Sequence, residues 1–194
     1  MKKHLKQQLP PGDFGIWIVV YIELITFALL FLGYAFSRRA DVALFNQSQL
    51  LLDQRFGFAN TLILITSSYF VVKAVESIQL IDRKKAASLS SKWLLLAMSL
   101  GSIFIINKII EFVGKAEQGI NLSTNSFFMF YLILTAFHFL HLLLGMIILF
   151  NIQQKVKKGA YSKDDYKGME SGAIYWHLVD LLWIVLFPLI YIIR

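Results

Sequence analysis

The sequence of 194 residues contains no cysteine, which excludes disulfide bonds, thiolate metal sites and iron–sulfur clusters. It also lacks a Walker loop, a GxSxG nucleophile elbow and a dinucleotide-binding fingerprint. No internal repeat and no low-complexity tract is present. No catalytic constellation can be assembled from the usual soluble-enzyme motifs, so the function has to be sought in the apolar segments that make up most of the chain.

Hydrophobic residues account for 57% of the sequence, which exceeds the roughly 45–50% of soluble domains. Apolar runs of about twenty residues recur, and each is long enough to cross a hydrocarbon core of about 30 Å. Most of these runs are apolar all round, whereas the helices of a soluble bundle need a polar face. The composition therefore predicts an all-α, polytopic transmembrane bundle.

Five membrane-spanning helices are predicted, and together they form a single membrane domain over residues 1–194. The spans are expected at about 15–36, 58–81, 93–113, 127–150 and 173–193. A short interfacial helix is expected around residues 43–52, between the first two spans. The basic start Met1–His4 is not followed by a small-residue cleavage site, so we expect the first span to be a retained helix rather than a signal peptide.

The net charge of +7 comes from lysines and arginines in the loops. No basic stripe interleaved with aromatics is present, so nucleic acid is not an expected partner. Twelve of the nineteen basic residues lie on one side of the predicted bundle, in the N-terminus and in the second and fourth loops. The positive-inside rule predicts a cytoplasmic N-terminus and an external C-terminus.

Several ionisable side chains lie inside the apolar spans, where they are energetically costly and are candidates for function. Glu23 in the first span must be protonated, paired or hydrated, and it could serve a proton-linked site, a partner contact or a simple interhelical hydrogen bond. Lys73–Glu76 and Lys108–Glu111 are each three residues apart and share a helix face. We expect both pairs near the interface, with snorkelling lysines.

The histidines of the last two spans come in same-face arrangements. His138 and His141 are three residues apart and could be part of a metal site, for which only His177 and Glu111 are available as further ligands. His177 and Asp180 are also three apart, so the carboxylate could orient the imidazole. Hydrogen bonds between helices are the favoured interpretation of both pairs, because such bonds hold membrane bundles together.

Two segments resemble subunit III of haem–copper oxidases. The segment 130–145 is similar to that family's "TGxHxxHxxxG" pattern, and 175–183 is similar to its "YWHFVDxxW" pattern. Glu111 and Phe112 stand where the family has a glutamate followed by an aromatic residue.

The resemblance extends through the first three spans as well. Asn60 and Thr61 resemble the start of the family's Asn-Thr-rich helix, and Glu23 matches the acidic position of its "SExxFF" segment. Departures include Ala136 for the usual glycine and Lys108 for a polar or acidic residue. The resemblance covers roughly residues 12–193 and implies the five-helix form, without the first two of seven helices.

The resemblance implies a non-catalytic accessory subunit of a respiratory terminal oxidase in the bacterial inner membrane. Haem and copper are expected in partner subunits, with the catalytic subunit I as the main partner. A bound phospholipid is expected in this chain. The chain is also expected to sustain proton uptake by the catalytic subunit and to support the stability of that subunit. The segment 11–17 is similar to NorE-type proteins, so an accessory role beside a nitric oxide reductase catalytic subunit is the alternative.

The expected site residues are partner, lipid-cleft or proton-linked candidates rather than catalytic or metal-binding groups: Glu23, Glu111, His138, His141, His177 and Asp180. An interpretation of another class is a stand-alone metal-dependent membrane enzyme that uses the three histidines of the last two spans. A proton-coupled transporter built around Glu23 is less favoured, because the chain lacks an inverted repeat and glycine–proline-broken helices.

Overall fold

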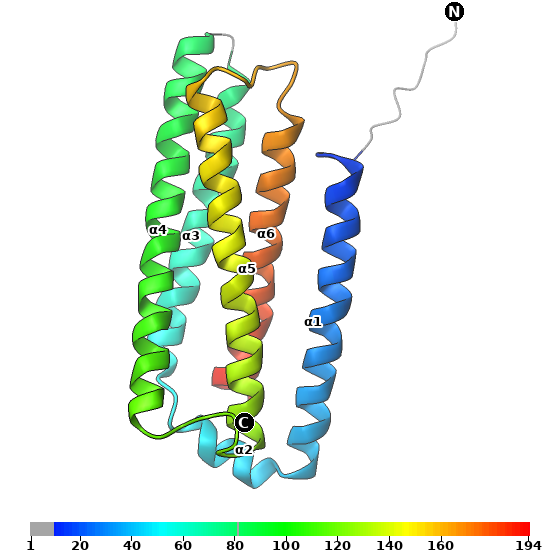
Figure 1. Cartoon of the computed structure of the whole chain (residues 1–194), viewed down its shortest axis with the longest axis vertical. Coiled ribbons are helices and arrows are strands. Elements are labelled where there is room, and N and C mark those ends of the chain that lie inside the picture. The colour runs from blue at the N-terminus through cyan, green and yellow to red at the C-terminus, as the bar shows by residue number, and fades with distance from the viewer. Residues whose placement is uncertain (1–9, 81) are drawn as a thin grey trace, which may run out of the picture.

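A computed structural model describes residues 10–80 and 82–194, and in these ranges the chain is helical, without a β-strand (Figure 1). The elements are α1 Phe14–Ala40, α2 Val42–Gln49, α3 Gln54–Ile78, α4 Arg83–Glu117, α5 Ser126–Lys157, α6 Lys167–Phe187 and the π-helix η1 Pro188–Ile192. Five of the helices are long and apolar enough to cross a membrane, which confirms the predicted five-helix bundle. The short helix expected after the first span is present as α2.

Most helix ends lie outside the predicted apolar spans. Helix α4 begins ten residues before Trp93, because the Asp82 side chain caps its first turn by accepting hydrogen bonds from the backbone N–H groups of Lys84 and Lys85. Asp53 caps α3 in the same way, so that helix starts at Gln54, whereas its other end, at Ile78, lies before the predicted end of the span. Helices α5 and α6 likewise run into the polar loop between them. Hydropathy locates the bilayer-crossing part of a helix, whereas caps determine where the helix ends.

Helices α3, α4, α5 and α6 form the compact part of the bundle, and α1 lies at its edge against α5 and α6 (Figure 1). The buried residues of α1 are Val20, Phe27 and Tyr34, spaced by seven, so the helix contributes only one narrow stripe to the interior. Most of its surface is apolar and exposed. Helix α1 is therefore held to the bundle along a single line of contact.

The indole of Trp176 sits where α6 meets α4 and α5. A Cβ atom added at Gly145 would come within 3.0 Å of this ring, and one added at Gly101 would do the same. Trp176 itself is buried. Glycine at these two positions lets the indole lie directly against the backbones of both neighbouring helices, as small residues do in membrane bundles.

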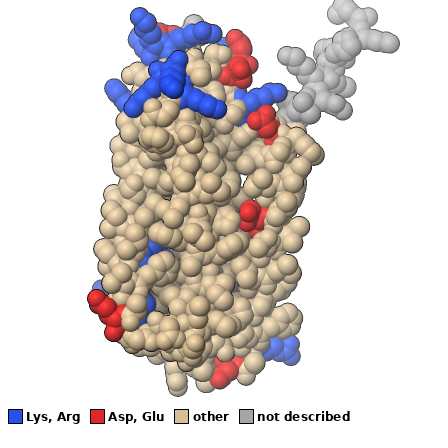
Figure 2. Space-filling view, in the orientation of Figure 1, with Lys and Arg blue, Asp and Glu red and all other residues tan. Residues whose placement is uncertain are grey.

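Basic side chains gather at the end of the bundle where α4 and α6 begin, and the middle of the visible face is almost free of charge (Figure 2). This end carries the second and fourth loops, which contribute most of the basic residues on the predicted cytoplasmic side. Lys2, Lys3 and Lys6 lie outside the described residues, as does the start Met1–His4. The orientation of the bundle in a membrane stays a prediction.

Candidate functional site

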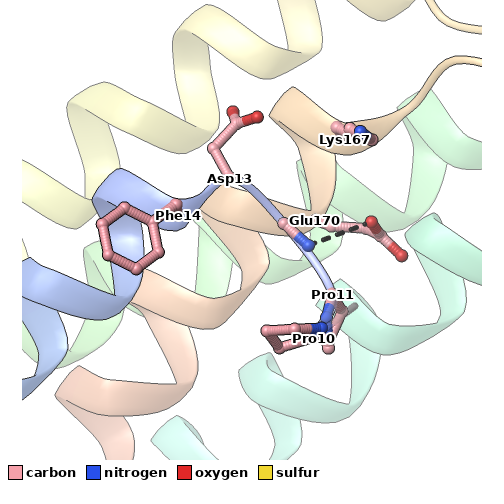
Figure 3. A pocket seen from close by; sticks show the side chains of 7 residues that line it. Pro10, Pro11, Asp13, Phe14, Lys167 and Glu170 are labelled. Carbon is pink, nitrogen blue, oxygen red and sulfur yellow. Dashed lines mark hydrogen bonds between the residues drawn. The ribbon is translucent and has the colours of Figure 1, made fainter. Parts of the chain in front are cut away.

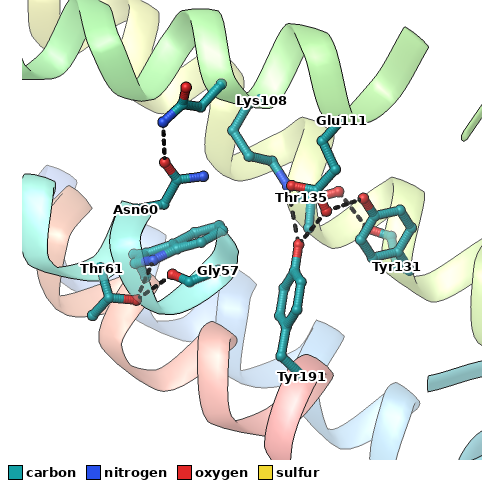
Figure 4. A network of polar contacts seen from close by, with 10 residues as sticks. Gly57, Asn60, Thr61, Lys108, Glu111, Tyr131, Thr135 and Tyr191 are labelled. Atoms are coloured by element: carbon teal, nitrogen blue, oxygen red, sulfur yellow. Dashed lines mark hydrogen bonds and ion pairs between the residues drawn. The ribbon is translucent and has the colours of Figure 1, made fainter. Parts of the chain in front are cut away.

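A buried ion pair lies at the centre of a polar network between α4, α5 and the C-terminal π-helix (Figure 4). The Lys108 side chain is completely buried, and its Nζ donates to Glu111 Oε2 over 3.0 Å. The other carboxylate oxygen, Oε1, accepts hydrogen bonds from the hydroxyls of Tyr131 at 2.6 Å and Tyr191 at 2.5 Å. The carboxylate of Glu111 thus joins three elements.

Aromatic rings enclose the Lys108 ammonium group. Its Nζ lies 5.0 Å from the ring centre of Phe112 and 5.3 Å from that of Trp183, and it also faces the rings of Tyr131 and Tyr191. The prediction that Lys108 snorkels to the interface was wrong. The ring faces and the carboxylate replace the water that the ammonium group would otherwise seek. By contrast, Lys73 and Glu76 form their expected pair at 2.7 Å on an exposed face.

Pro188 explains how Tyr191 reaches this network. Proline has no N–H to donate, and at this residue α6 gives way to the wider π-helix η1. The π-helix is fastened by two side-chain amides of neighbouring elements: Gln49 donates to the Ile190 carbonyl at 2.8 Å, and Gln54 donates to the Tyr191 carbonyl at 2.6 Å. Sequence reasoning missed both tyrosines of the network. The expectation that no helix is broken at a glycine or proline was wrong for the last span, because α6 gives way to η1 at Pro188.

His138 connects α5 to α6. It is completely buried, and its Nε2 lies 3.0 Å from the Val179 carbonyl oxygen, which assigns the proton to that nitrogen. The ring packs against Phe104 and Trp183. Trp183 in turn donates its indole N–H to Thr61 Oγ1 on α3 at 3.0 Å (Figure 4). His138 therefore belongs to the packed interior of the bundle.

Glu23 and His141 form the contact between the middle of α1 and α5. Glu23 Oε2 lies 2.9 Å from His141 Nε2, and His141 Nδ1 lies 2.8 Å from the Phe137 carbonyl oxygen. The carbonyl requires a proton on Nδ1, so the proton between Nε2 and the carboxyl group is shared by the pair. Two arrangements are possible, either neutral acid and imidazole or carboxylate and imidazolium. Of the three states considered for Glu23, the structure has the paired one.

His177 contacts Ser68 on α3 and Asp180 on its own helix, and not the histidines of α5. His177 Nδ1 shares a hydrogen bond of 2.5 Å with Ser68 Oγ on α3, and the Asp180 carboxylate lies 3.6 Å from the same nitrogen. The expected same-face pair is therefore present, with Ser68 as a third member that the spacing did not predict.

Each of the three membrane histidines thus has a different partner. His138 meets a backbone carbonyl, His141 meets a carboxyl group on α1, and His177 meets a hydroxyl on α3. Within residues 10–80 and 82–194, no three His, Cys, Asp or Glu side chains come together as a metal-ligating group. The described geometry therefore offers no ligand set for the metal-dependent enzyme.

Polar contacts also fasten both ends of α1. At its start, the Gly12 N–H donates to Glu170 Oε2 at 3.2 Å, beside a pocket lined by Pro10, Pro11, Phe14 and Lys167 (Figure 3). At its other end, Arg38 donates to the Ile193 carbonyl at 2.7 Å. Together with Glu23 and His141, these contacts hold α1 at three levels.

Removing one member of the Lys108–Glu111 pair should destabilise the protein more than removing both. A lone Glu111→Leu change leaves a buried ammonium group without its carboxylate, which typically costs about 3–5 kcal/mol, whereas an apolar pair of similar volume is nearly neutral. Thermal unfolding of the purified variants should rank Glu111→Leu as the least stable, with Lys108→Met/Glu111→Leu closer to wild type.

The exposed pair provides the control. Glu76→Leu removes the carboxylate of an ion pair with the same spacing on an exposed face and should change the unfolding temperature little. Equal decreases in unfolding temperature for Glu76→Leu and Glu111→Leu would contradict the conclusion that burial makes the Lys108–Glu111 pair costly to break.

Comparison with known proteins places this arrangement in a family. The sequence profile described as cytochrome c oxidase subunit III matches residues 13–194. Cytochrome c oxidase subunit 3 of Synechocystis sp. is 32% identical over 180 residues, covering 92% of this chain and 74% of the relative. Cytochrome bo(3) ubiquinol oxidase subunit 3 of Buchnera aphidicola subsp. Acyrthosiphon pisum is 28% identical over 188 residues, covering 92% and 85%. This multi-pass membrane chain therefore belongs to the subunit III family of haem–copper oxidases.

Proposed function

We propose that the chain is a non-catalytic accessory subunit of a respiratory haem–copper oxidase in a bacterial inner membrane, and that it packs against the catalytic subunit I. The proposal is based on the hydrogen-bond partners of the polar side chains inside the spans. Glu111, His138 and Glu23 each bond one helix to another and do not converge on an open reaction site. Haem and copper would then be held by partner subunits.

The relatives leave two electron donors open, since their names include both cytochrome c and quinol oxidases. A nitric oxide reductase partner is the alternative, and the NorE-like segment 11–17 supports it. The identity of the haem-carrying subunit that binds the chain decides among these partners.

Co-purification tests the accessory role. A tagged chain extracted from its own membranes in a mild detergent should carry haem in a fixed ratio, and mass spectrometry should identify the haem-carrying protein as an oxidase catalytic subunit. A tagged, unrelated membrane protein from the same cells serves as the control and should carry none. A haem-free chain in a membrane that contains assembled oxidase would contradict the proposal, and a nitric oxide reductase subunit would establish the alternative.

The shared proton of Glu23 and His141 supports a proton-linked role. The Glu23 side chain is 21% exposed, and it lies at the tenth residue of α1, about 15 Å along the helix. A carboxyl group that is partly open and already shares a proton can take up or release one when water reaches it. This pair is the part of the chain best suited to support proton uptake by the partner.

The Glu23→Gln substitution should remove the exchangeable proton of the carboxyl group while keeping the hydrogen bond between α1 and His141. Glutamine can still donate to His141 Nε2, so α1 stays attached and the complex should assemble with its usual haem content. The assembled oxidase should lose activity faster during turnover, because the exchangeable proton is gone. Glu23→Leu, which also removes the hydrogen bond, should weaken assembly as well. Turnover lifetime at wild-type level in the assembled Glu23→Gln complex would show that the pair is only a packing contact.

A groove between α1, α2 and the C-terminal residues is our candidate lipid site. It measures about 410 Å³ and is lined by apolar groups with two arginines at its edge: Tyr34, Ala35, Arg38, Arg39, Val42, Leu189 and Ile193. Arg38 is occupied by Asn46 and the Ile193 carbonyl, whereas Arg39 is exposed. An acyl chain fits the apolar wall, and a guanidinium group suits a lipid phosphate.

Arg39→Gln should reduce the phospholipid that remains on the purified protein, because it removes the charge nearest the proposed headgroup. Arg55→Gln is a matched control, since Arg55 is exposed at the same end of the bundle outside the groove. Native mass spectrometry should count fewer lipids per chain for Arg39→Gln only. Equal lipid counts in both variants would place the lipid elsewhere.

A further inference from the structure

One polar cluster faces outward from the middle of the bundle. His177 is the eleventh residue of the 26-residue span from Lys167 to Ile192, which places it about 15 Å along the helix. Its side chain is 37% exposed, and Asp180, one turn further, is partly exposed as well. Both groups thus lie at mid-depth on the outside of the subunit, where a polar group in contact with lipid is costly.

The described helices do not supply hydrogen-bond partners for all the polar atoms of His177 and Asp180. His177 Nδ1 is engaged by Ser68, but no described residue forms a hydrogen bond with Nε2. The Asp180 carboxylate has only the 3.6 Å ion-pair contact with the same Nδ1, and within the described ranges it accepts no hydrogen bond. Hydrocarbon chains supply neither donor nor acceptor, so both groups call for a protein partner.

The contacts of Nδ1 indicate what the partner must offer. When Ser68 donates to Nδ1, the proton of the neutral imidazole lies on Nε2, and when Nδ1 carries the proton instead, Nε2 is an acceptor. An amide or hydroxyl side chain offers both a donor and an acceptor, so it matches Nε2 in either tautomer and can also donate to Asp180.

The surrounding surface is apolar and long enough to receive a helix. Leu181 and Ile184 continue the exposed face of α6, and Ile65 and Tyr69 flank it on α3 beside Ser68. Helix α1 borders the other side, where its contacts are with α5 and α6 and it makes no extensive contact with α3 (Figure 1). This α6 face, defined by His177, Asp180, Leu181 and Ile184, lies open between two helices.

We propose that the α6 face is the docking surface for a membrane-spanning helix of the catalytic subunit, and that this helix carries an amide or hydroxyl side chain opposite His177 and Asp180. The proposal rests on the function proposed above and assigns its contact surface. A second copy of the chain is the competing occupant, because a two-fold contact could place His177 of one copy opposite Asp180 of the other, and the crosslinking experiment distinguishes the two. Lipid fits less well because its chains cannot hydrogen-bond.

Site-directed crosslinking tests the position, and the absence of cysteine makes the wild-type chain a ready background. Leu181→Cys, labelled with a benzophenone maleimide in membranes and irradiated, should form an adduct with the haem-carrying catalytic subunit. Leu96→Cys is the control, because Leu96 is almost equally exposed, at 46% against 49%, in the middle of α4. It should give lipid adducts only.

The outcomes separate this inference from the function on which it rests. If haem co-purifies with the Leu181→Cys chain but the label reacts only with lipid or with a second copy, the docking surface is wrong while the accessory role stands. If no haem co-purifies with wild type, the accessory role itself fails. An adduct with the catalytic subunit from Leu96→Cys alone would move the interface to α4.

Substitution of His177 tests the hydrogen bond. His177→Phe keeps an aromatic ring but removes the outward ring nitrogen, and the haem retained per chain should fall about fivefold to thirtyfold, the effect of a membrane hydrogen bond of about 1–2 kcal/mol. His177→Gln restores a side chain that can hydrogen-bond and should recover most of the haem. The unfolding temperature of the isolated subunit distinguishes lost docking from lost folding. Wild-type haem retention in a folded His177→Phe variant would overturn the proposal.

Discussion

Inside a bilayer no water is available to satisfy a polar side chain, so each one must find its partner within the protein. Lys108 is the clearest example. Its ammonium group is fully buried and depends on one carboxylate, the Tyr191 hydroxyl and four aromatic rings from α4, α5, α6 and η1. Removal of either Lys108 or Glu111 would leave a charge without its partner in hydrocarbon. The network therefore fixes α4, α5, α6 and η1 in one arrangement relative to one another.

The same constraint accounts for the attachment of α1. This helix buries only a narrow apolar stripe, and lipid offers no hydrophobic reason for two apolar helices to associate. Polar contacts at Gly12, Glu23 and Arg38 supply the directed interactions at three levels. Of these three, the Glu23–His141 contact joins two titratable side chains in the middle of α1, which is why we assign the proposed proton-linked role to it.

Much of the candidate site follows from spacing. Residues three apart share a helix face, and this rule predicted the pairs Lys73–Glu76, Lys108–Glu111 and His177–Asp180, all of which the structure contains. The rule did not distinguish a buried pair from an exposed one. Lys73 and Lys108 have the same local pattern, yet one lies on the outer face of α3 and the other under the rings of α5, α6 and η1.

The sequence by itself determined the five spans, the same-face pairs and the family, because hydropathy, helical period and motif order are local properties of the chain. Only the tertiary structure decided which helix each polar side chain meets. His138 and His141 share a face by spacing, but one reaches α6 and the other reaches α1. Tyr191 meets Glu111 from η1, the π-helix that begins at Pro188. The rotation of each helix about its axis and the path of the backbone at a proline depend on contacts between segments far apart in the chain, which spacing within one helix cannot specify.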